Sequence, residues 1–286
     1  MNFFEKIMMF LTSEIDSAPK SYGAFHLIML AVIVSAAIII NVKFYNVSDR
    51  SFRKILAVLW CVMVVGEIYH QSCFFFGVEN GVVTWEYQWY KFPFQFCATP
   101  LYILPLAIFP RNKKVRGLAE AFLMSFSLFA GLAVIIYPND VFVSLIGASV
   151  QSMIHHGLQV VIGIFIGIRN RKRLTFKFFL GGALIFVILL VLAVIINEIG
   201  FHLLRGAGLD DTFNMFYLSP YFSCTLPVLC DLYPILPYPL FFAVYLFGFC
   251  AIAAIVFYII KGLSALITRI KNTNFIESSK GKYAKI

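Results

Sequence analysis

Charged residues are scarce in this chain. They make up 13% of its 286 residues, whereas a soluble domain carries about 25%. In their place the chain has 61% hydrophobic residues, arranged in long apolar runs between short basic loops. This pattern is typical of a polytopic membrane protein and argues against a soluble domain. The net charge of +9 does not indicate nucleic-acid binding, because the positions of the charges explain it better.

No secretory signal peptide is expected from the first residues either. Residues 1–16 hold only a short apolar run, which acidic residues interrupt. The segment is instead predicted to form a short amphipathic helix on the bilayer surface, whose apolar side chains are Phe3, Phe4, Ile7, Met8, Phe10 and Leu11.

Seven apolar runs are long enough to cross about 30 Å of hydrocarbon. They are predicted at residues 22–44, 55–77, 93–110, 117–137, 149–168, 177–200 and 236–261. Lysine and arginine alternate in number between the connecting segments, so that 19 fall on one side of the predicted membrane and four on the other. The positive-inside rule then places the N-terminus outside and the C-terminus in the cytoplasm.

We therefore predict an all-α integral membrane protein with seven transmembrane helices. Residues 1–268 are expected to form a single polytopic membrane domain, and residues 269–286 a basic cytoplasmic tail. The long segment 201–236 is expected to cover the outer end of the domain with short interfacial or re-entrant pieces, because it is rich in proline and aromatic residues.

Polar residues are rare inside the predicted spans, and they gather in the outer half. Gln151, His155 and Gln159 recur every four residues and form one stripe on a helix, with His156 near its edge. Imidazoles and amides are costly in hydrocarbon, so they should face protein or a water-filled cavity. We predict one polar chamber near the outer surface, formed by His26, Glu67, His70, Gln71, Gln95, Cys97, Gln151, His155, His156, Gln159, Asn197, Glu198 and His202.

Cys97 lies about one turn below the predicted outer surface, where Pro100 and Pro105 are expected to kink the third span. A thiol in apolar surroundings is an inert packing residue, whereas a neighbouring imidazole makes it a nucleophile. The residues leave open a packing role, a Cys–His catalytic pair, a proton or solute pathway, and a zinc site formed by His155, His156, Glu67 and Glu198. No spacing matches a known zinc motif, and no repeat relates the two halves of the chain.

The other cysteines divide by predicted depth. Cys61 and Cys250 lie mid-span without polar neighbours and are predicted to be packing residues. Cys73, Cys224 and Cys230 lie near the predicted outer surface, where disulfides are permitted, and the sequence does not assign pairs among them.

Five short motifs carry a resemblance to a known family: Gly66-Glu67, Pro93-Phe-Gln-Phe-Cys97, Tyr137-Pro138, Ile154-His155-His156 and Phe213-Asn214-Met215. On these residues the chain resembles the YwaF family of bacterial integral membrane proteins, from about Glu67 to the last span. That family is related to a eukaryotic transmembrane acyltransferase that remodels ether phospholipids. The chain departs from the family pattern beside Cys97, where family members often have a polar residue and this sequence has Phe96 and Ala98.

The resemblance implies a multi-pass protein of the plasma membrane, in which Cys97 takes an acyl group from a phospholipid as a thioester and His156 acts as general base. His155 remains open as the base because it is adjacent. Glu67 or His155 would hold the ring of His156, and a second set of polar residues would support the site: Gln95 and Asn214 as oxyanion donors, and Gln159 in the stripe.

The hypothesis is therefore a membrane-embedded acyltransferase or transacylase that moves a fatty acyl group between phospholipids. Its partners would be membrane phospholipids, and it would need no metal or soluble cofactor. The alternative is a non-enzymatic lipid or small-solute binding protein, or a transporter, that uses the same chamber.

Overall fold

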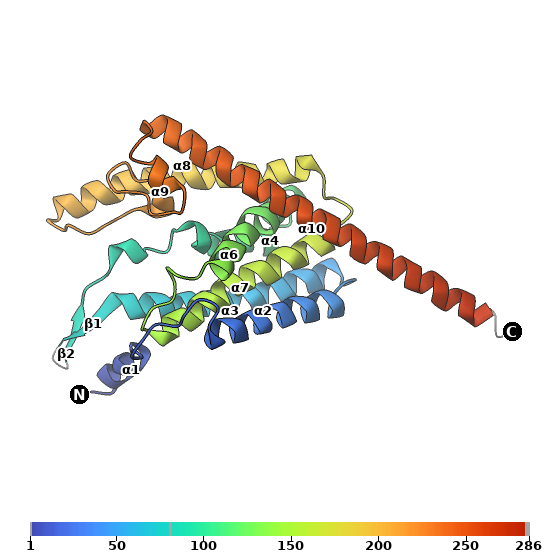
Figure 1. The fold of residues 1–286 in the computed structure, drawn as a ribbon, viewed down its shortest axis with the longest axis horizontal. Coiled ribbons are helices and arrows are strands. Elements are labelled where there is room, and N and C mark those ends of the chain that lie inside the picture. The colour runs from blue at the N-terminus through green and yellow to red at the C-terminus, as the bar shows by residue number, and fades with distance from the viewer. Residues whose placement is uncertain (1, 80–81, 284–286) are drawn as a thin grey trace.

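The computed structural model describes residues 2–79 and 82–283 and shows a mainly helical protein (Figure 1). Its long helices run side by side along one direction, and α10 (Tyr238–Tyr283) crosses the others and extends beyond them (Figure 1). α10 continues through the predicted tail as far as Tyr283, while residues 284–286, and the side chains from residue 272 onwards, lie outside the described part.

Five helical segments in the described residues are long and apolar enough to cross a membrane. They are α2 (Ala24–Lys43), the continuous run Lys113–Ile136, α7 (Ile146–Arg169), α8 (Phe176–Gly206) and the Tyr238–Lys271 part of α10. The run Lys113–Ile136 consists of α5 (Lys113–Phe122), a π-helical segment η3 (Leu123–Ser127) and α6 (Leu128–Ile136). These five confirm helices at the first, fourth, fifth, sixth and seventh predicted spans.

The remaining two predicted spans take different forms. α3 (Asp49–Phe75) covers the second predicted span with 27 residues. The third is broken, because the 3₁₀ turn η2 (Phe96–Ala98) precedes a helix of only nine residues, α4 (Pro100–Ile108). Nine helical residues rise only about 14 Å, so α4 alone cannot cross a bilayer. The seven-span count therefore remains a prediction.

α7 is the central helix of the bundle. It packs against α2, α3 and α6, while α5 packs on α8. Glycine lets the backbones approach closely in two of these contacts. A Cβ on Gly131 of α6 would lie 2.7 Å from the carbonyl oxygen of His156, and one on Gly182 of α8 would lie 2.9 Å from the backbone of Ala121. Small residues at helix interfaces let backbones approach closely in this way.

The two ends of the bundle differ in character. At the N-terminal end, the helix predicted for this segment is confirmed as α1 (Phe3–Leu11), and its position on the bilayer surface stays a prediction. Tyr69 of α3 donates to the Leu11 carbonyl oxygen of α1 at 3.1 Å. The opposite end, called here the basic end, brings together the start of α3, the start of α5 and the end of α7, since Asp49, Lys113 and Arg169 line one cavity there.

A two-stranded antiparallel hairpin corrects the all-α prediction. β1 (Phe76–Glu79) follows α3 directly and pairs with β2 (Val82–Trp85), close to α1 (Figure 1). Residues 80–81 between the strands lie outside the described part. A short 3₁₀ turn, η1 (Trp89–Lys91), leads from the hairpin toward the interrupted third predicted span, residues 92–108, called here the broken segment.

The segment between α8 and α10 is built from short pieces, as predicted. It contains the 3₁₀ turn η4 (Met215–Tyr217) and a single helical turn, α9 (Leu229–Leu232). Phe216 and Tyr217 have positive φ angles of 57° and 56°, and side-chain amides from other segments hold this strained backbone. Asn197 of α8 donates to the Met215 carbonyl oxygen at 2.9 Å and accepts from the Met215 N–H at 2.6 Å.

Candidate functional site

The polar stripe predicted on the fifth span lies on α7 and is buried. Gln151, His155 and Gln159 are at most 9% exposed, and His156 beside them is 4% exposed. Because α7 is surrounded by other helices, its polar residues face protein rather than lipid. This confirms the placement that the spacing predicts.

The stripe reaches the broken segment at the backbone of Cys97. His155 Nε2 lies 2.9 Å from the Cys97 carbonyl oxygen, and the Gln159 side-chain amide donates to the same oxygen at 2.9 Å. Pro100 has no N–H with which to continue the helical ladder, so backbone carbonyls in this stretch need other donors. The Thr99 hydroxyl supplies one of them, to the Phe96 carbonyl oxygen at 2.7 Å. His155 and Gln159 therefore fix the main chain at Cys97 and leave its thiol free of these contacts.

His156 is held by its own helix. Its Nδ1 lies 2.7 Å from the Ser152 carbonyl oxygen and 3.2 Å from the Ser152 hydroxyl. A carbonyl oxygen can only accept a hydrogen bond, so Nδ1 carries the proton and Nε2 of the neutral ring carries the lone pair. Nε2 is buried and has no hydrogen-bond partner in the described part of the chain. The ring is thus oriented with a free base atom.

One cavity of about 230 Å³ brings the main candidates together. Its walls come from α3, η1, the broken segment, the loop between α6 and α7, and the first half of α7, with Tyr217 added from η4. The predicted chamber residues that line it are Glu67, His70, Gln95, Cys97, Gln151, His155 and His156. A thiol and an imidazole with an unpartnered nitrogen on the wall of one cavity are the groups that acyl transfer requires.

A comparison with known protein families matches residues 21–261 to the TMEM164 family. The matched range covers most of the chain and contains every residue that lines the cavity. This chain belongs to the TMEM164 family. No curated protein and no solved structure matches it. The family is one of transmembrane proteins, and together with the five apolar helices it identifies a multi-pass membrane protein.

In this TMEM164-family protein the predicted support of His156 needs correction. Glu67 accepts from the Gln71 side chain at 2.7 Å and lies 3.8 Å from His70 Nδ1, all within α3. His155 contacts Cys97 rather than holding the ring of His156, and the two ring centroids are 5.4 Å apart. Ser152 orients the ring instead, because its carbonyl oxygen lies one helical turn before His156.

Gln95 and Asn214, the predicted oxyanion donors, mainly support backbone. The Gln95 amide donates to the Asn214 carbonyl oxygen at 3.0 Å and accepts from the Phe216 N–H at 2.9 Å. The Asn214 side chain accepts from the Ser219 N–H at 2.8 Å and donates to the Ser223 carbonyl oxygen at 3.1 Å. Gln95 lines the cavity, whereas Asn214 is not among the described residues that do.

The rest of the predicted chamber lies elsewhere in the TMEM164-family fold. His26 accepts from the Tyr22 N–H and contacts the Ile135 carbonyl oxygen, at 2.9 Å each. Gln71 bonds to the Lys91 carbonyl oxygen and Asn197 to Met215. The Glu198–His202 pair is exposed. The prediction of one chamber for all of these residues was too inclusive.

The structure also bears on the predicted disulfides and on the hypothesis of a zinc site. All six cysteines carry free thiols. The disulfides that the sequence permitted among Cys73, Cys224 and Cys230 are therefore not formed. Within residues 2–79 and 82–283, no group of three or more His, Cys, Asp or Glu side chains is placed to hold a metal ion.

The polar cavity residues that the sequence reasoning missed include Lys91, Asp140, Ser152 and Tyr217. Lys91 is the only cation on the wall of this cavity among the described residues, and its Nζ lies 4.6 Å from the ring centroid of Phe74. Burial lowers the pKa of Lys91 below its usual value. The signal available in the sequence was that Lys91 is the only lysine or arginine in the predicted loop between the second and third spans.

Proposed function

We propose that this TMEM164-family protein is an acyltransferase or transacylase of the membrane that moves a fatty acyl group between phospholipids through a thioester on Cys97. The observation that carries the proposal is the cavity that Cys97 and His156 both line, together with the buried, unpartnered Nε2 of His156. Because Nδ1 of His156 is held at the Ser152 carbonyl oxygen, Nε2 is the ring nitrogen that can accept a thiol proton.

Two apolar grooves beside the cavity support a lipid substrate. One of about 580 Å³ lies along α3 and α4, and shares Glu67 and Pro93 with the cavity. Ile68, which is 63% exposed, borders this groove. The other, of about 360 Å³, lies between α3 and α7 and shares Gln151 and His155 with the cavity. Acyl chains in these grooves would bring ester groups to the polar cavity.

The proposed reaction has two balanced halves. His156 Nε2 takes the thiol proton of Cys97 while the sulfur attacks the ester carbonyl carbon of a phospholipid. Gln95 lines the cavity, and the second N–H of its amide is proposed to donate to the oxyanion. The carbon–oxygen bond breaks, and the departing lysophospholipid oxygen takes the proton from His156. A second lysophospholipid hydroxyl then gives its proton to His156 and attacks the thioester. The carbon–sulfur bond breaks, and the sulfur recovers the proton.

The proposal includes the seven-span arrangement in the plasma membrane, with the N-terminus outside. α3 supports it, because its 27 residues extend about 40 Å and run beside α7. The cavity would then face the outer leaflet and receive phospholipids from that side. The competing function, a lipid or solute binder or transporter, is favoured by the role of His155 and Gln159 in holding backbone at Cys97.

Intact mass measurement of the purified protein in phospholipid tests the proposal. We expect an acyl adduct that hydroxylamine removes, because hydroxylamine cleaves thioesters. Cys97→Ser should lose the thioester, while Cys250→Ser, a cysteine outside the cavity, should keep it. Absence of the adduct from wild type in every phospholipid tried, or an equal adduct in Cys97→Ser, would overturn the proposal in favour of the binder.

A further inference from the structure

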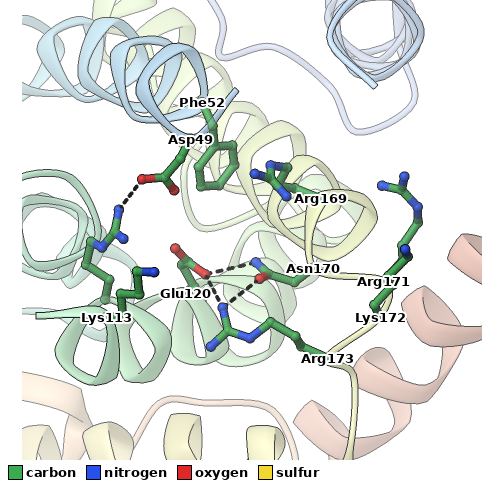
Figure 2. Close-up of a pocket in the computed structure, with 10 residues that line it drawn as sticks. Asp49, Phe52, Lys113, Glu120, Arg169, Asn170, Arg171, Lys172 and Arg173 are labelled. Atoms are coloured by element: carbon green, nitrogen blue, oxygen red, sulfur yellow. Dashed lines mark hydrogen bonds and ion pairs between the residues drawn. The ribbon is translucent and has the colours of Figure 1, made fainter. Parts of the chain in front are cut away.

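A second and larger cavity, of about 730 Å³, lies at the basic end of the bundle (Figure 2). It is formed by the starts of α3 and α5 and by the end of α7 with the loop that follows. It takes no part in the proposed acyl transfer, because His156 and Arg169 are 13 residues apart on α7, or about 20 Å along the helix.

The walls of this cavity carry six cationic side chains and two carboxylates, Asp49 and Glu120. The surplus is four positive charges, and the cationic residues are Lys113, Arg116, Arg169, Arg171, Lys172 and Arg173.

Both carboxylates are already engaged. Arg116 donates to Asp49 at 2.9 Å, and this hydrogen bond holds the pKa of the Asp49 carboxyl below its usual value. Glu120 accepts from the Asn170 side chain at 2.9 Å and lies 3.8 Å from Arg173 (Figure 2). These pairs leave no free carboxylate among the described residues that line the cavity.

Four of the cationic side chains have no carboxylate within ion-pair distance in the described part of the chain: Lys113, Arg169, Arg171 and Lys172. Arg171 turns to Asn46 and the ring of Tyr45. Figure 2 shows Lys113 and Arg169 on different sides of the cavity. The unpaired positive charge therefore lies on more than one side of the cavity.

Buried guanidinium groups distinguish this cavity from an ordinary basic loop. Arg116 is 8% exposed, and the Nε atoms of Arg116 and Arg169 are buried with no acceptor in the described residues. Unsatisfied buried donors on charged groups are costly, so an anion is the natural acceptor. A loop that only determined membrane orientation would need positive charge and no buried donors.

We propose that this cavity binds a phosphate monoester, either the head group of an anionic lipid or a soluble phosphate ester. A phosphate monoester carries up to two negative charges and three acceptor oxygens, which suit guanidinium groups from separate helices that line one cavity. The volume exceeds that of a bare phosphate and lies in the range of small-molecule sites. Basic pockets between membrane helices bind anionic lipid head groups in the same way.

Binding measurements on the purified full-length protein test the proposal. Nanodiscs of phosphatidylcholine with labelled phosphatidic acid present the lipid form, and glycerol 3-phosphate in solution presents the soluble form. Saturable binding of either probe supports the site, and the probe that binds identifies the source. Absence of saturable binding by both probes would overturn the proposal.

The variant Arg169→Gln/Lys172→Gln should weaken binding about tenfold or more, since each charged hydrogen bond is worth at least that factor. The matched control Lys114→Gln/Lys177→Gln removes two charges from neighbouring exposed positions that do not line the cavity, and it should bind like wild type. An equal loss in both would show non-specific charge attraction and overturn the site. The single variant Lys172→Gln, at an exposed residue, repeats the test with minimal effect on folding.

Discussion

At the scale of single residues, neighbouring polar side chains on α7 have different roles. His155 and Gln159 recognise the carbonyl oxygen of Cys97, so they shape the backbone that carries the thiol. His156 is turned one position around the helix, is held by Ser152 and keeps Nε2 unpartnered. The geometry therefore favours His156 over His155 as the proposed base, a choice that the adjacent pair in the sequence left open.

His156→Asn is the sharpest residue-scale variant. The asparagine amide can replace Nδ1–H as a donor to the Ser152 carbonyl oxygen but offers no lone pair in place of Nε2. We expect thioester formation on Cys97 to slow by about 10²–10⁴-fold, the usual contribution of a general base. The rate of adduct appearance, followed by intact mass, measures the effect.

Ser152→Ala is its matched comparison. It removes the hydroxyl at 3.2 Å but keeps the backbone carbonyl oxygen at 2.7 Å, so the ring should remain oriented. We expect the adduct to form within about tenfold of the wild-type rate, because one neutral hydrogen bond is worth about 1 kcal/mol. If Ser152→Ala were as slow as His156→Asn, the hydroxyl rather than the carbonyl would be the orienting group.

At the scale of elements, the helices could be predicted and their interruptions only in part. Long apolar runs predicted α2, α7, α8 and α10, because an apolar run of about 20 or more residues is typical of a helix that crosses a bilayer. Pro100 and Pro105 indicated a kink near Cys97, but the full break depends on donors from α7 that lie more than 50 residues away. The prolines indicate where backbone hydrogen bonds of the helix are lost. Contacts with other helices determine which donors take the place of the lost ones.

The β1–β2 hairpin and Ser152 were missed for different physical reasons. Asn80-Gly81 between apolar runs is a common hairpin signal, yet it adjoins a long helix whose apolar pattern concealed it. Ser152 acts through its backbone carbonyl, which side-chain chemistry does not reveal. Sites built from main-chain atoms are the part of a structure that residue types predict least well.

The contact between α6 and α7 gives an element-scale prediction. A Cβ on Gly131 would lie 2.7 Å from the His156 carbonyl oxygen and 2.8 Å from the Gln159 Cβ, so one helix must move. Gly131→Ala should destabilise the fold by about 1–3 kcal/mol, as overpacking does, and should slow adduct formation because His156 shifts. Thermal unfolding of the detergent-purified protein measures the stability change.

Gly248→Ala serves as the control for that contact. Its added Cβ meets nothing within 4 Å, and the position is an exposed part of α10. Alanine favours helix over glycine by up to about 1 kcal/mol, so this variant should be as stable as wild type or slightly more so. Equal destabilisation by the two substitutions would mean that helix propensity, and not the α6–α7 contact, governs both.

At the scale of the whole molecule, the open question is how many times the chain crosses the membrane. α3 and α7 lie side by side over their length, since Asp49 and Arg169 share the basic cavity while Tyr69 and Gly147 border one groove at the other end. The broken segment, together with η1 before it, also runs between these ends. The Lys91 carbonyl oxygen accepts from Gln71, and the Ile108 carbonyl oxygen accepts from Arg53.

Both stretches therefore cover the same depth as α7, which is long and apolar enough to cross a membrane. We expect seven crossings, one of them through non-helical backbone that is buried in protein, where its polar groups find partners.

Labelling with a membrane-impermeant maleimide in intact cells tests this. Glu86→Cys and Asn139→Cys, both exposed, should react from outside, and exposed Lys172→Cys only after permeabilisation. Five crossings would move Glu86→Cys to the inside while leaving Asn139→Cys outside. The inverse orientation would exchange Asn139→Cys and Lys172→Cys, and would place the phosphate cavity, rather than the thiol, on the outer face.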